Sequence, residues 1–264
     1  MTVTTLRTAA PRISIVVPTY NEAKNLPHVF GLIAQVEGVH EVIVVDGRSS
    51  DGTIEMAQSL MPDVKIVRQT RKGKGNALAC GFEAVTGDII VMLDADGSAD
   101  PREIPAYVEA LVNGADFAKG TRFALGGGSD DITRIRRIGN WGLNFIVNVL
   151  FGTRYTDLCF GYNEFWVHCL QVLELSSGHD EAAMLWGDGF EIETVINTRI
   201  AKAKLTIAEV KSYEFDRIHG TSNLNAVSDG LRVLKAIMIE RFTKAAPAPV
   251  VPSNVVAIRQ AIAA

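Results

Sequence analysis

Four short runs rich in β-branched residues recur along the N-terminal part of the chain, and each leads into a polar turn. The runs cover residues 13–17, 41–45, 64–67 and 89–93. The segments after the first two runs, and the segment before the fourth, carry apolar side chains at helical spacing. Continuous apolar runs of this length are typical of strands that are buried on both faces of a parallel sheet. Their order therefore predicts an α/β fold with a doubly wound, mostly parallel sheet flanked by helices.

Two carboxylates, those of Asp94 and Asp96, stand directly after the fourth run. Ligands of open α/β sheets collect beyond the carboxyl ends of the strands. Oxygen ligands at that place suit Mg²⁺ or Mn²⁺, because Mg²⁺ usually takes one or two protein carboxylates and leaves its other positions to water and phosphate. We therefore expect both carboxylates to bind such a metal. A solvated turn or a helix cap is the alternative for an acidic pair that stands alone.

Polar segments also follow the first two runs, and a basic turn precedes the helix before the fourth. Residues 18–22 and 46–53 end the first two strands, and Asp46 faces any ligand above the sheet. The basic turn, residues 71–76, contains two glycines that allow close approach of the backbone, and its cations suit a pyrophosphate. A solvated turn is the alternative there. The glycine spacing matches neither a Walker nor a dinucleotide motif, which disfavours P-loop and nicotinamide chemistry.

These segments resemble a known family. The three successive signatures of family 2 glycosyltransferases of the GT-A fold have counterparts, in order and spacing, at residues 17–22 (VPTYNE), 45–53 (VDGRSSDGT) and 93–96 (LDAD). Residues 119–123 (KGTRF), 126–128 (GGG) and 136–140 resemble the subgroup that makes polyprenyl-phosphate sugars, the dolichyl-phosphate mannosyl- and glucosyltransferase type. The resemblance spans residues 12–225 and implies a nucleotide-diphospho-sugar transferase fold.

The resemblance implies a donor site for a nucleotide-diphosphate sugar. Asp46 would accept hydrogen bonds from the base or ribose, and Asp96 would bind the divalent metal, with Asp94 sharing it or holding the ribose. The metal would withdraw charge from the departing nucleoside diphosphate. Ser98 departs from the family pattern, since relatives often carry a Gln there as a third metal ligand. The expected donor-binding residues are Pro18, Tyr20, Glu22, Asp46, Lys74, Asp94 and Ala95.

The resemblance also implies a site for an acceptor phosphate. Arg122 and Arg136 match the family positions that hold this phosphate, and guanidinium groups bind phosphate through two parallel hydrogen bonds. Asn140 takes a position where relatives commonly have Ser, and it can still donate a hydrogen bond. A phosphate is already an anionic nucleophile near neutral pH, so its attack needs no strong general base. The expected catalytic residues for this acceptor are therefore Asp96 and the two arginines.

An acidic segment leaves a second acceptor class open. Residues 187–193 (GDGFEIE) open a predicted helix, and family 2 enzymes that act on sugar hydroxyls take a general base from this part of the chain. A hydroxyl must lose its proton as it attacks, and Asp188 or Glu191 is the expected base in that case. The structural alternative is that Asp188 caps the helix while Glu191 or Glu193 pairs with Arg199.

Composition narrows the class of protein. A chain of 264 residues, 47% of them hydrophobic, can bury one large core, and its net charge of -4 gives no reason to expect nucleic acid as a partner. The three cysteines form neither an even disulfide framework nor a metal-binding spacing, which indicates a reducing compartment. Residues 1–10 lack a signal-peptide pattern, and no stretch reaches the roughly 18 to 20 apolar residues that a membrane-spanning helix needs. We therefore expect a cytoplasmic protein that acts peripherally at the cytosolic face of a membrane.

Two segments bear on that membrane. Residues 141–151 form a mostly apolar helix, for which core packing is favoured over a membrane-facing surface. Residues 229–244 form an amphipathic helix with positive charges around its apolar face, which lies on an anionic membrane or docks on the core. The expected divisions of the chain are a flexible N-terminus (1–11), the glycosyltransferase domain (12–228), this helix, and a flexible C-terminal tail (245–264).

The sequence thus predicts an inverting, metal-dependent glycosyltransferase. It would move a hexose from a nucleotide diphosphate, of the GDP-mannose or UDP-glucose type, to a polyprenyl phosphate, with a membrane surface or a membrane-anchoring partner presenting the lipid. A glycan or small-molecule hydroxyl is the alternative acceptor, with Asp188 as the base. A non-catalytic nucleotide-sugar-binding module is the alternative from another class. A nucleotidyltransferase is disfavoured, because residues 20–22 replace the Gly-rich basic loop that such enzymes use.

Overall fold

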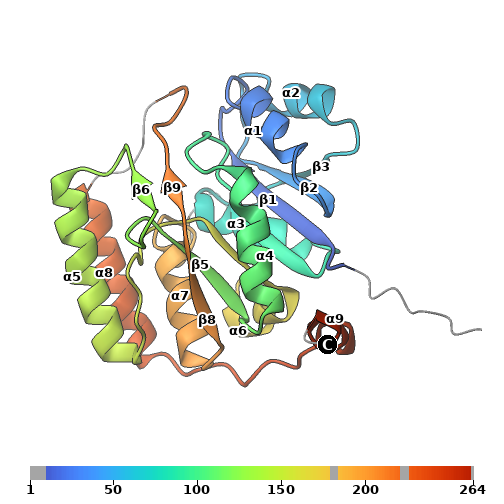
Figure 1. Cartoon of the computed structure of the whole chain (residues 1–264). Helices are drawn as coiled ribbons and strands as arrows, with labels where there is room; N and C mark the ends of the chain where they lie inside the picture. The colour runs from blue at the N-terminus through green and yellow to red at the C-terminus, as the bar shows by residue number, and fades with distance from the viewer. Residues whose placement is uncertain (1–9, 179–183, 221–225, 263–264) are drawn as a thin grey trace, which may run out of the picture.

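The computed structural model describes residues 10–178, 184–220 and 226–262. The strands of its main sheet are β1 (Ile13–Thr19), β2 (Val39–Asp46), β3 (Lys65–Arg68), β4 (Ile89–Met92), β5 (Phe117–Thr121), β7 (Asn163–Trp166) and β8 (Ile207–Lys211). They lie in the spatial order β3-β2-β1-β4-β7-β5-β8 (Figure 1). The four predicted strands are the first four along the chain, and they pair in parallel. The α/β fold with a mostly parallel sheet is therefore confirmed.

The second half of the sheet departs from the simple repeat. Strand β7 inserts between β4 and β5 and runs antiparallel to both, whereas β8 pairs in parallel with β5 at the edge. Two further short strands, β6 (Gly128–Ser129) and β9 (Tyr213–Glu214), pair with each other outside the main sheet. Segments from the second half of the chain therefore lie beside the carboxyl ends of β1 and β4.

Helices cover both faces of the sheet, and two further helices form a pair at one side of it. The α-helices are α1 (Leu26–Ile33), α2 (Thr53–Leu60), α3 (Lys74–Glu83), α4 (Ile104–Val112), α5 (Arg134–Phe151), α6 (Leu170–Leu173), α7 (Ile192–Lys202), α8 (Ala226–Phe242) and α9 (Ser253–Ile262). Two 3₁₀ turns, η1 (Pro101–Glu103) and η2 (Val167–Cys169), precede α4 and α6.

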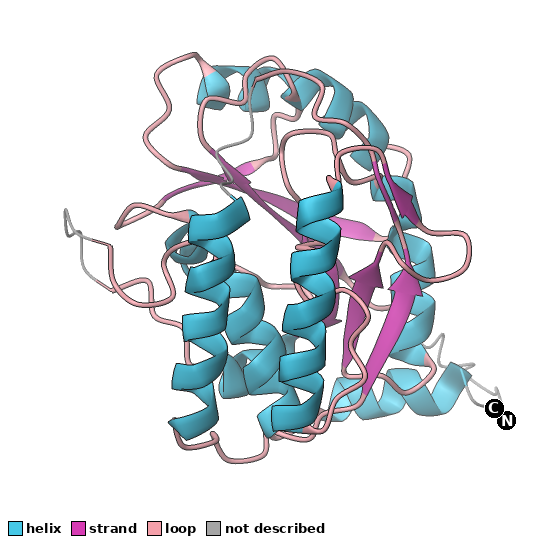
Figure 2. Ribbon diagram, turned by 90° about the vertical axis from the view of Figure 1, so that its left-hand side faces the viewer, coloured by secondary structure: helices cyan, strands magenta, loops and turns pink. Residues whose placement is uncertain are grey.

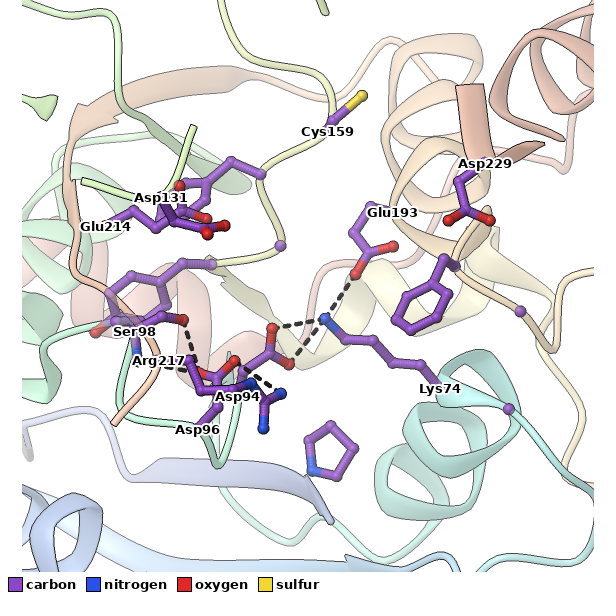
Figure 3. A pocket seen from close by; sticks show the side chains of 18 of the residues that line it. Lys74, Asp94, Asp96, Ser98, Asp131, Cys159, Glu193, Glu214, Arg217 and Asp229 are labelled. Carbon is purple, nitrogen blue, oxygen red and sulfur yellow. Dashed lines mark hydrogen bonds and ion pairs between the residues drawn. The ribbon is translucent and has the colours of Figure 1, made fainter. Parts of the chain in front are cut away.

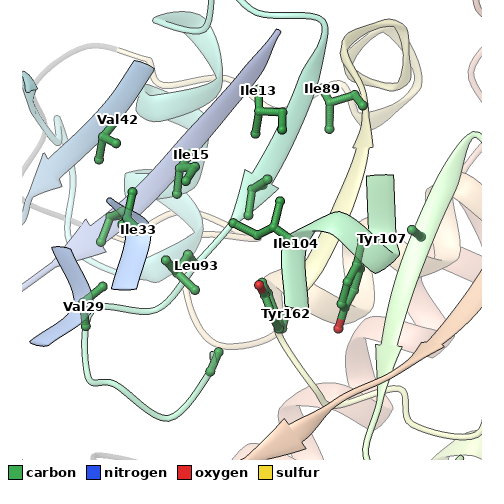
Figure 4. Close-up of a cluster of buried hydrophobic side chains, with 14 of the residues drawn as sticks. Ile13, Ile15, Val29, Ile33, Val42, Ile89, Leu93, Ile104, Tyr107 and Tyr162 are labelled. Carbon is green, nitrogen blue, oxygen red and sulfur yellow. The ribbon is translucent and has the colours of Figure 1, made fainter. Parts of the chain in front are cut away.

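Alternation along β1 explains why most of its residues are apolar. Ile13, Ile15 and Val17 point to the face covered by α1, α2, α4 and α9, where they join one buried cluster (Figure 4). Val16 points to the opposite face and packs in the cluster under α3, α6 and α7. Because both faces of the strand are buried, consecutive positions can be apolar without being exposed to water.

The C-terminal segment differs from the predicted flexible tail. Residues 253–262 form α9, which packs near α4 and buries Val255 and Ile258 in the first cluster. Arg259 fixes the helix further, because its guanidinium donates to the Asp116 carboxylate at 3.0 Å and lies over the Trp166 ring. The prediction of a flexible tail at residues 245–264 allowed at most a short, weakly attached helix at its end, and it is corrected here because this helix is attached to the core. Residues 1–9 of the expected N-terminal tail lie outside the described residues.

The helix pair α5 and α8 lies side by side and packs on α7 (Figures 1 and 2). Val147 of α5 and Ile237 of α8 meet in a third buried cluster, so α8 does dock on the protein. Core packing was the favoured prediction for all of residues 141–151, yet Trp141 and Phe145 are 72% and 62% exposed. The prediction is wrong for this outward face. Among the described residues, no helix combines the length and the apolar character required to cross a bilayer.

One carboxyl group of the central sheet is buried without a partner. Glu164 in β7 is fully buried, and neither of its carboxyl oxygens has a hydrogen-bond partner in the described part of the protein. Burial raises the pKa of Glu164 well above its usual range. The folded protein therefore holds this group protonated, whereas the unfolded chain releases the proton above about pH 4.5.

Glu164→Gln is expected to become more stabilising as the pH rises. The parent protein loses stability above pH 4.5, because only its unfolded state gives up the proton, and Gln removes this dependence. The difference in unfolding free energy between variant and parent should grow by up to about 1.4 kcal/mol per pH unit. Urea unfolding between mildly acidic and neutral pH measures it. Glu109→Gln, at an exposed position of α4, is the control, and a pH-independent difference for Glu164→Gln would contradict the assignment.

Candidate functional site

A cleft of about 760 Å³ opens at the carboxyl ends of β1 and β4, between these strands and the first turns of α3, α5, α7 and α8. The structure brings most of the predicted site residues together here. Those that line the cleft are Pro18, Tyr20, Glu22, Lys74, Asp94, Ala95, Asp96, Arg122, Arg136 and Asn140. Asp46 and Asp188 are not among the lining residues.

Lys74 joins the two sides of the cleft. It is the first residue of α3, and its Nζ lies 2.8 Å from the Asp94 carboxylate and 2.7 Å from Glu193 of α7 (Figure 3). Burial opposes the charge on Lys74, but the two carboxylates outweigh this effect and hold its pKa above the ordinary value. Lys74 is therefore a positively charged residue placed directly beside a strand-end carboxylate.

Arg217 makes the same kind of contact with the second strand-end carboxylate. Its guanidinium lies 3.1 Å from Asp96 and 2.9 Å from Glu22, and these carboxylates keep its pKa raised although burial opposes it. Asp96 also accepts hydrogen bonds from the backbone N–H and the hydroxyl of Ser98. Protein cations therefore lie directly beside both Asp94 and Asp96.

Arg122 is the most enclosed cation of the cleft. It directly follows β5, and its guanidinium pairs with Asp157 at 2.7 Å and with Glu214 at 2.8 Å. Burial opposes its charge, but the two carboxylates raise the pKa of Arg122. Asn140 of α5 donates to the same Asp157 carboxylate at 3.0 Å. Two buried anions thus balance the single charge of Arg122.

Arg136 is more accessible than Arg122. It lies in the first turn of α5, its side chain is 25% exposed, and it pairs with Asp131 at 2.5 Å. The Asp131 side chain is itself 42% exposed, so water can solvate this carboxylate if the guanidinium turns to another anion. Arg136 is therefore the predicted acceptor-side arginine that can exchange its partner at the lowest cost.

Asp188 faces away from the cleft. Arg71 holds both of its carboxylate oxygens, with distances of 2.8 and 2.9 Å, and both side chains are buried. The Asp188 backbone carbonyl also accepts the Gly75 N–H at 2.7 Å. A Cβ at Gly75 would stand 1.8 Å from the Gly187 oxygen, so the glycine permits close approach to this loop. This geometry does not support Asp188 as a general base or as a helix cap.

Asp46 is likewise turned to its own backbone. Its carboxylate is buried and accepts the N–H groups of Arg48 and Ser49, at 2.9 and 3.2 Å. The next residue, Gly47, does line the cleft, as does Tyr20, whose side chain is 61% exposed. Asp46 therefore shapes the turn beside the predicted base and ribose site, and any contact with the nucleotide stays a prediction.

The donor set fits a metal only in part. No group of three or more His, Cys, Asp or Glu side chains that would hold an ion occurs in the described parts of the chain. Asp94 and Asp96 nevertheless both line the cleft, and two carboxylates are what Mg²⁺ or Mn²⁺ needs when phosphate oxygens supply other positions. These two residues are therefore the ones that would hold the metal.

Sequence reasoning missed several charged partners at the site. Asp157 and Glu214 lie 35 and 92 residues from Arg122 and carry no local signature of their pairing. Glu193 was considered only as a partner of Arg199, which instead pairs with Glu240. The acidic segment around Glu193 was a usable signal, but its spacing alone does not tell which carboxylate enters the cleft.

Comparisons with known proteins identify the family of the chain. Residues 14–170 match the family model described as glycosyl transferase family 2. An undecaprenyl-phosphate mannosyltransferase from Micrococcus luteus is 30% identical over 210 residues, which cover 75% of this chain and 84% of that protein. Glycosyltransferase AglJ from Haloferax volcanii is 31% identical over 83% of this chain and 68% of its own length.

Two further matches define the limits of the likeness. A dolichol-phosphate mannosyltransferase from Pyrococcus furiosus is 41% identical over 121 residues, which are 44% of this chain and span only 34% of that protein. Glucosyl-3-phosphoglycerate synthase from Mycobacterium tuberculosis, solved with Mn²⁺, uridine diphosphate and glucosyl-3-phosphoglycerate, superposes with a TM-score of 0.68 at 22% identity. The superposition covers 90% of this chain and 82% of that one and supports the fold. With the family match over more than half of its length, the chain belongs to glycosyl transferase family 2.

Proposed function

We propose that the protein is an inverting, metal-dependent hexosyltransferase that uses a nucleotide-diphosphate sugar as donor and a polyprenyl phosphate as acceptor at a membrane surface. The observation that carries the choice of acceptor is the charge pairing in the cleft. Each acidic side chain that lines the cleft in the described residues pairs with a protein cation, and these are Glu22, Asp94, Asp96, Asp131, Glu193, Glu214 and Asp229.

A general base must be able to accept a proton, and a carboxylate in an ion pair must first give up its partner. The cleft therefore favours an acceptor that arrives already deprotonated, which a phosphate monoester does and a hydroxyl does not. The names of the Micrococcus luteus and Pyrococcus furiosus relatives, both polyprenyl-phosphate mannosyltransferases, point to the same acceptor class.

The donor would lie across the strand ends. Tyr20 and Pro18 would border the base and ribose, and Asp94 and Asp96 would hold a Mg²⁺ or Mn²⁺ ion. Bound between these carboxylates and the diphosphate, the ion would stabilise the charge on the departing nucleoside diphosphate. Lys74 and Arg217, the cations already beside these carboxylates, are in reach of the same phosphates.

The acceptor would lie on the side of α5. An oxygen of the acceptor phosphate would attack the anomeric carbon of the sugar as the bond from that carbon to the diphosphate breaks. Arg136 would hold the phosphate in line, and Asn140 and Arg122 would support it from the floor of the cleft. We assign the direct contact first to Arg136, because Arg122 is already balanced by two buried carboxylates.

Sugar transfer by the purified protein tests the proposal. Radiolabelled GDP-mannose and UDP-glucose are each offered with a short-chain polyprenyl phosphate, in detergent, with Mg²⁺ or Mn²⁺. Labelled lipid that mild acid hydrolyses is the expected product, and it identifies the donor as well. Donor hydrolysis without lipid product would contradict the proposal of a phosphate acceptor. Transfer of the labelled sugar to hydroxyl acceptors would then be tested.

Asp96→Asn is expected to lower kcat by at least about 100-fold, because metal stabilisation of the leaving group is worth several kcal/mol. Asn keeps the hydrogen bonds to Ser98 within reach but loses the negative charge. Asp100→Asn, in the same loop but outside the cleft, is the control and should retain parental kcat. Parental kcat in the Asp96 variant would exclude it as a metal ligand.

Arg136→Gln is expected to raise the KM for the acceptor by about 10- to 100-fold, because a hydrogen bond to a charged group contributes about 1.5–3 kcal/mol. The KM for the donor should change little. Steady-state kinetics with each substrate varied measures both constants. Arg154→Gln, at an exposed position past α5, is the matched control. A rise confined to the KM for the donor would contradict the acceptor role and assign Arg136 to donor binding.

Metal and nucleotide are expected to bind together. A cation placed at Asp94 and Asp96 displaces Lys74 and Arg217 from these carboxylates, so each keeps only one of its two carboxylate partners, Glu193 or Glu22, and a bound diphosphate would replace the lost one. Titration calorimetry with Mn²⁺ should therefore show at least about tenfold tighter binding in the presence of the matching nucleoside diphosphate. Equal affinity with and without nucleotide would contradict the exchange of partners.

A further inference from the structure

The outward face of α5 carries a continuous stripe of large apolar side chains. Spacings of three and four residues place them on one side of the helix over four turns, and they are between 62% and 72% exposed. They are Ile135, Ile138, Trp141, Phe145 and Val149. The rings of Trp141 and Phe145 stack with centroids 6.4 Å apart. Contiguous apolar surface of this kind marks a binding surface, because isolated exposed residues are common but a stripe is not.

The neighbouring helix also exposes large apolar side chains. α8 lies beside α5 (Figure 2) and exposes Leu231, Met238 and Phe242, the last to 81%. Its buried residues, such as Ile237, meet α5 in the third cluster, so the exposed ones are left over after the pair has packed. Both helices of the pair therefore carry exposed apolar side chains.

The surface adjoins the cleft. Ile135 and Arg136 of α5 line the cleft, as do Arg232 and Val233 of α8. The first turns of both helices thus belong to the proposed acceptor site, while the stripe continues from these turns along α5 away from the cleft. A lipid acceptor whose phosphate lies at Arg136 would have its chain next to this stripe.

The charge of the two helices is opposite to that of the whole chain. The chain has a net charge of -4, yet α5 and α8 together contain six basic and two acidic residues. One of the acidic residues, Glu240, is buried and pairs with Arg199 and Lys202 of α7. Arg134 and Arg137 are exposed in the first turn of α5, beside the stripe. Basic residues next to exposed aromatic and aliphatic side chains favour the surface of an anionic lipid bilayer.

We propose that the outer face of α5, extended by α8, lies on an anionic membrane and turns the mouth of the cleft toward the bilayer. The choice of a lipid partner rests on the proposed function. A second copy of the chain fits this face less well, because a symmetric contact would bring the basic residues of both copies together. It would also cover the first turns of α5 and α8, which the acceptor must reach.

Vesicle co-sedimentation tests the proposal without any polyprenyl phosphate. The full chain should bind vesicles of phosphatidylcholine with phosphatidylglycerol more tightly than vesicles of phosphatidylcholine alone, and added salt should weaken the difference. The double substitution Phe145→Gln and Val149→Gln should weaken vesicle binding at least about tenfold, because it removes two apolar side chains that would be buried in the bilayer surface. Val250→Gln, 75% exposed between α8 and α9, is the matched control and should bind as the parent does. Equal binding by the double variant and the parent would overturn the assignment.

Tryptophan fluorescence gives a second measurement. Trp141 should be quenched by brominated lipids in vesicles, and Trp141→Phe should remove most of this quenching, because Trp166 is buried. Quenching that persists in Trp141→Phe would place the membrane contact elsewhere, for example at Trp186. Analytical ultracentrifugation tests whether a second copy covers this face. If the parent were a dimer and the double variant a monomer, a second copy would occupy the face, and this result would overturn the proposal.

Failure of this inference is distinguishable from failure of the proposed function. Phe145 and Val149 do not line the cleft, so the double variant should transfer sugar to the short-chain acceptor in detergent as the parent does. Transfer in detergent without vesicle binding by the parent would overturn the membrane face and leave the function intact. Vesicle binding without transfer to any polyprenyl phosphate would overturn the function and leave the membrane face intact.

Discussion

The ion pairs of Lys74 hold together the side of the cleft that we propose for the donor. Lys74 begins α3, Asp94 follows β4, and Glu193 lies in the first turn of α7, so one ammonium group joins three elements from distant parts of the chain. A largely buried charge is costly unless it is paired, and the pairing here is possible only when all three elements are in place. The cleft is therefore a product of the complete fold. A strand end alone would offer two solvated carboxylates and no defined cation beside them.

A second set of contacts determines where Lys74 stands. The Gly75 N–H and the Arg71 side chain both bind Asp188, one at its backbone and the other at its carboxylate. The start of α3 is thereby fixed against the loop that leads into α7, and a side chain at Gly75 would overlap that loop. The acidic residue that sequence reasoning offered as a general base thus has a structural environment. Through its contacts with the Arg71 side chain and the Gly75 N–H, Asp188 helps to fix the position of Lys74.

Much of the fold and part of the site could be predicted from the sequence, for identifiable reasons. The parallel strands and the carboxylates after β4 are local features, since apolar runs and the residues that follow them are contiguous in sequence. The pairing of Arg122 with Asp157 and Glu214 is not local, so no spacing rule finds it. The antiparallel insertion of β7 depends on which strand edge is free. A helix that is apolar on most sides, such as α5, does not reveal from sequence which side meets the protein.

The two sides of the cleft differ in how they are built, and this bears on how substrates would be told apart. The donor side rests on the sheet and its two large clusters, whereas α5 and α8 pack through a small separate cluster. A buried polar contact ties the helix pair to the sheet, because Asn140 and Arg122 both bind Asp157. Arg136 lies one turn before Asn140 on the same helix, so this contact also sets the position of the exposed acceptor-side cation. In the proposed function, Arg122 would therefore act on the acceptor side partly through α5, and changes on the outer face of the helix pair would alter access only of an acceptor held in a membrane.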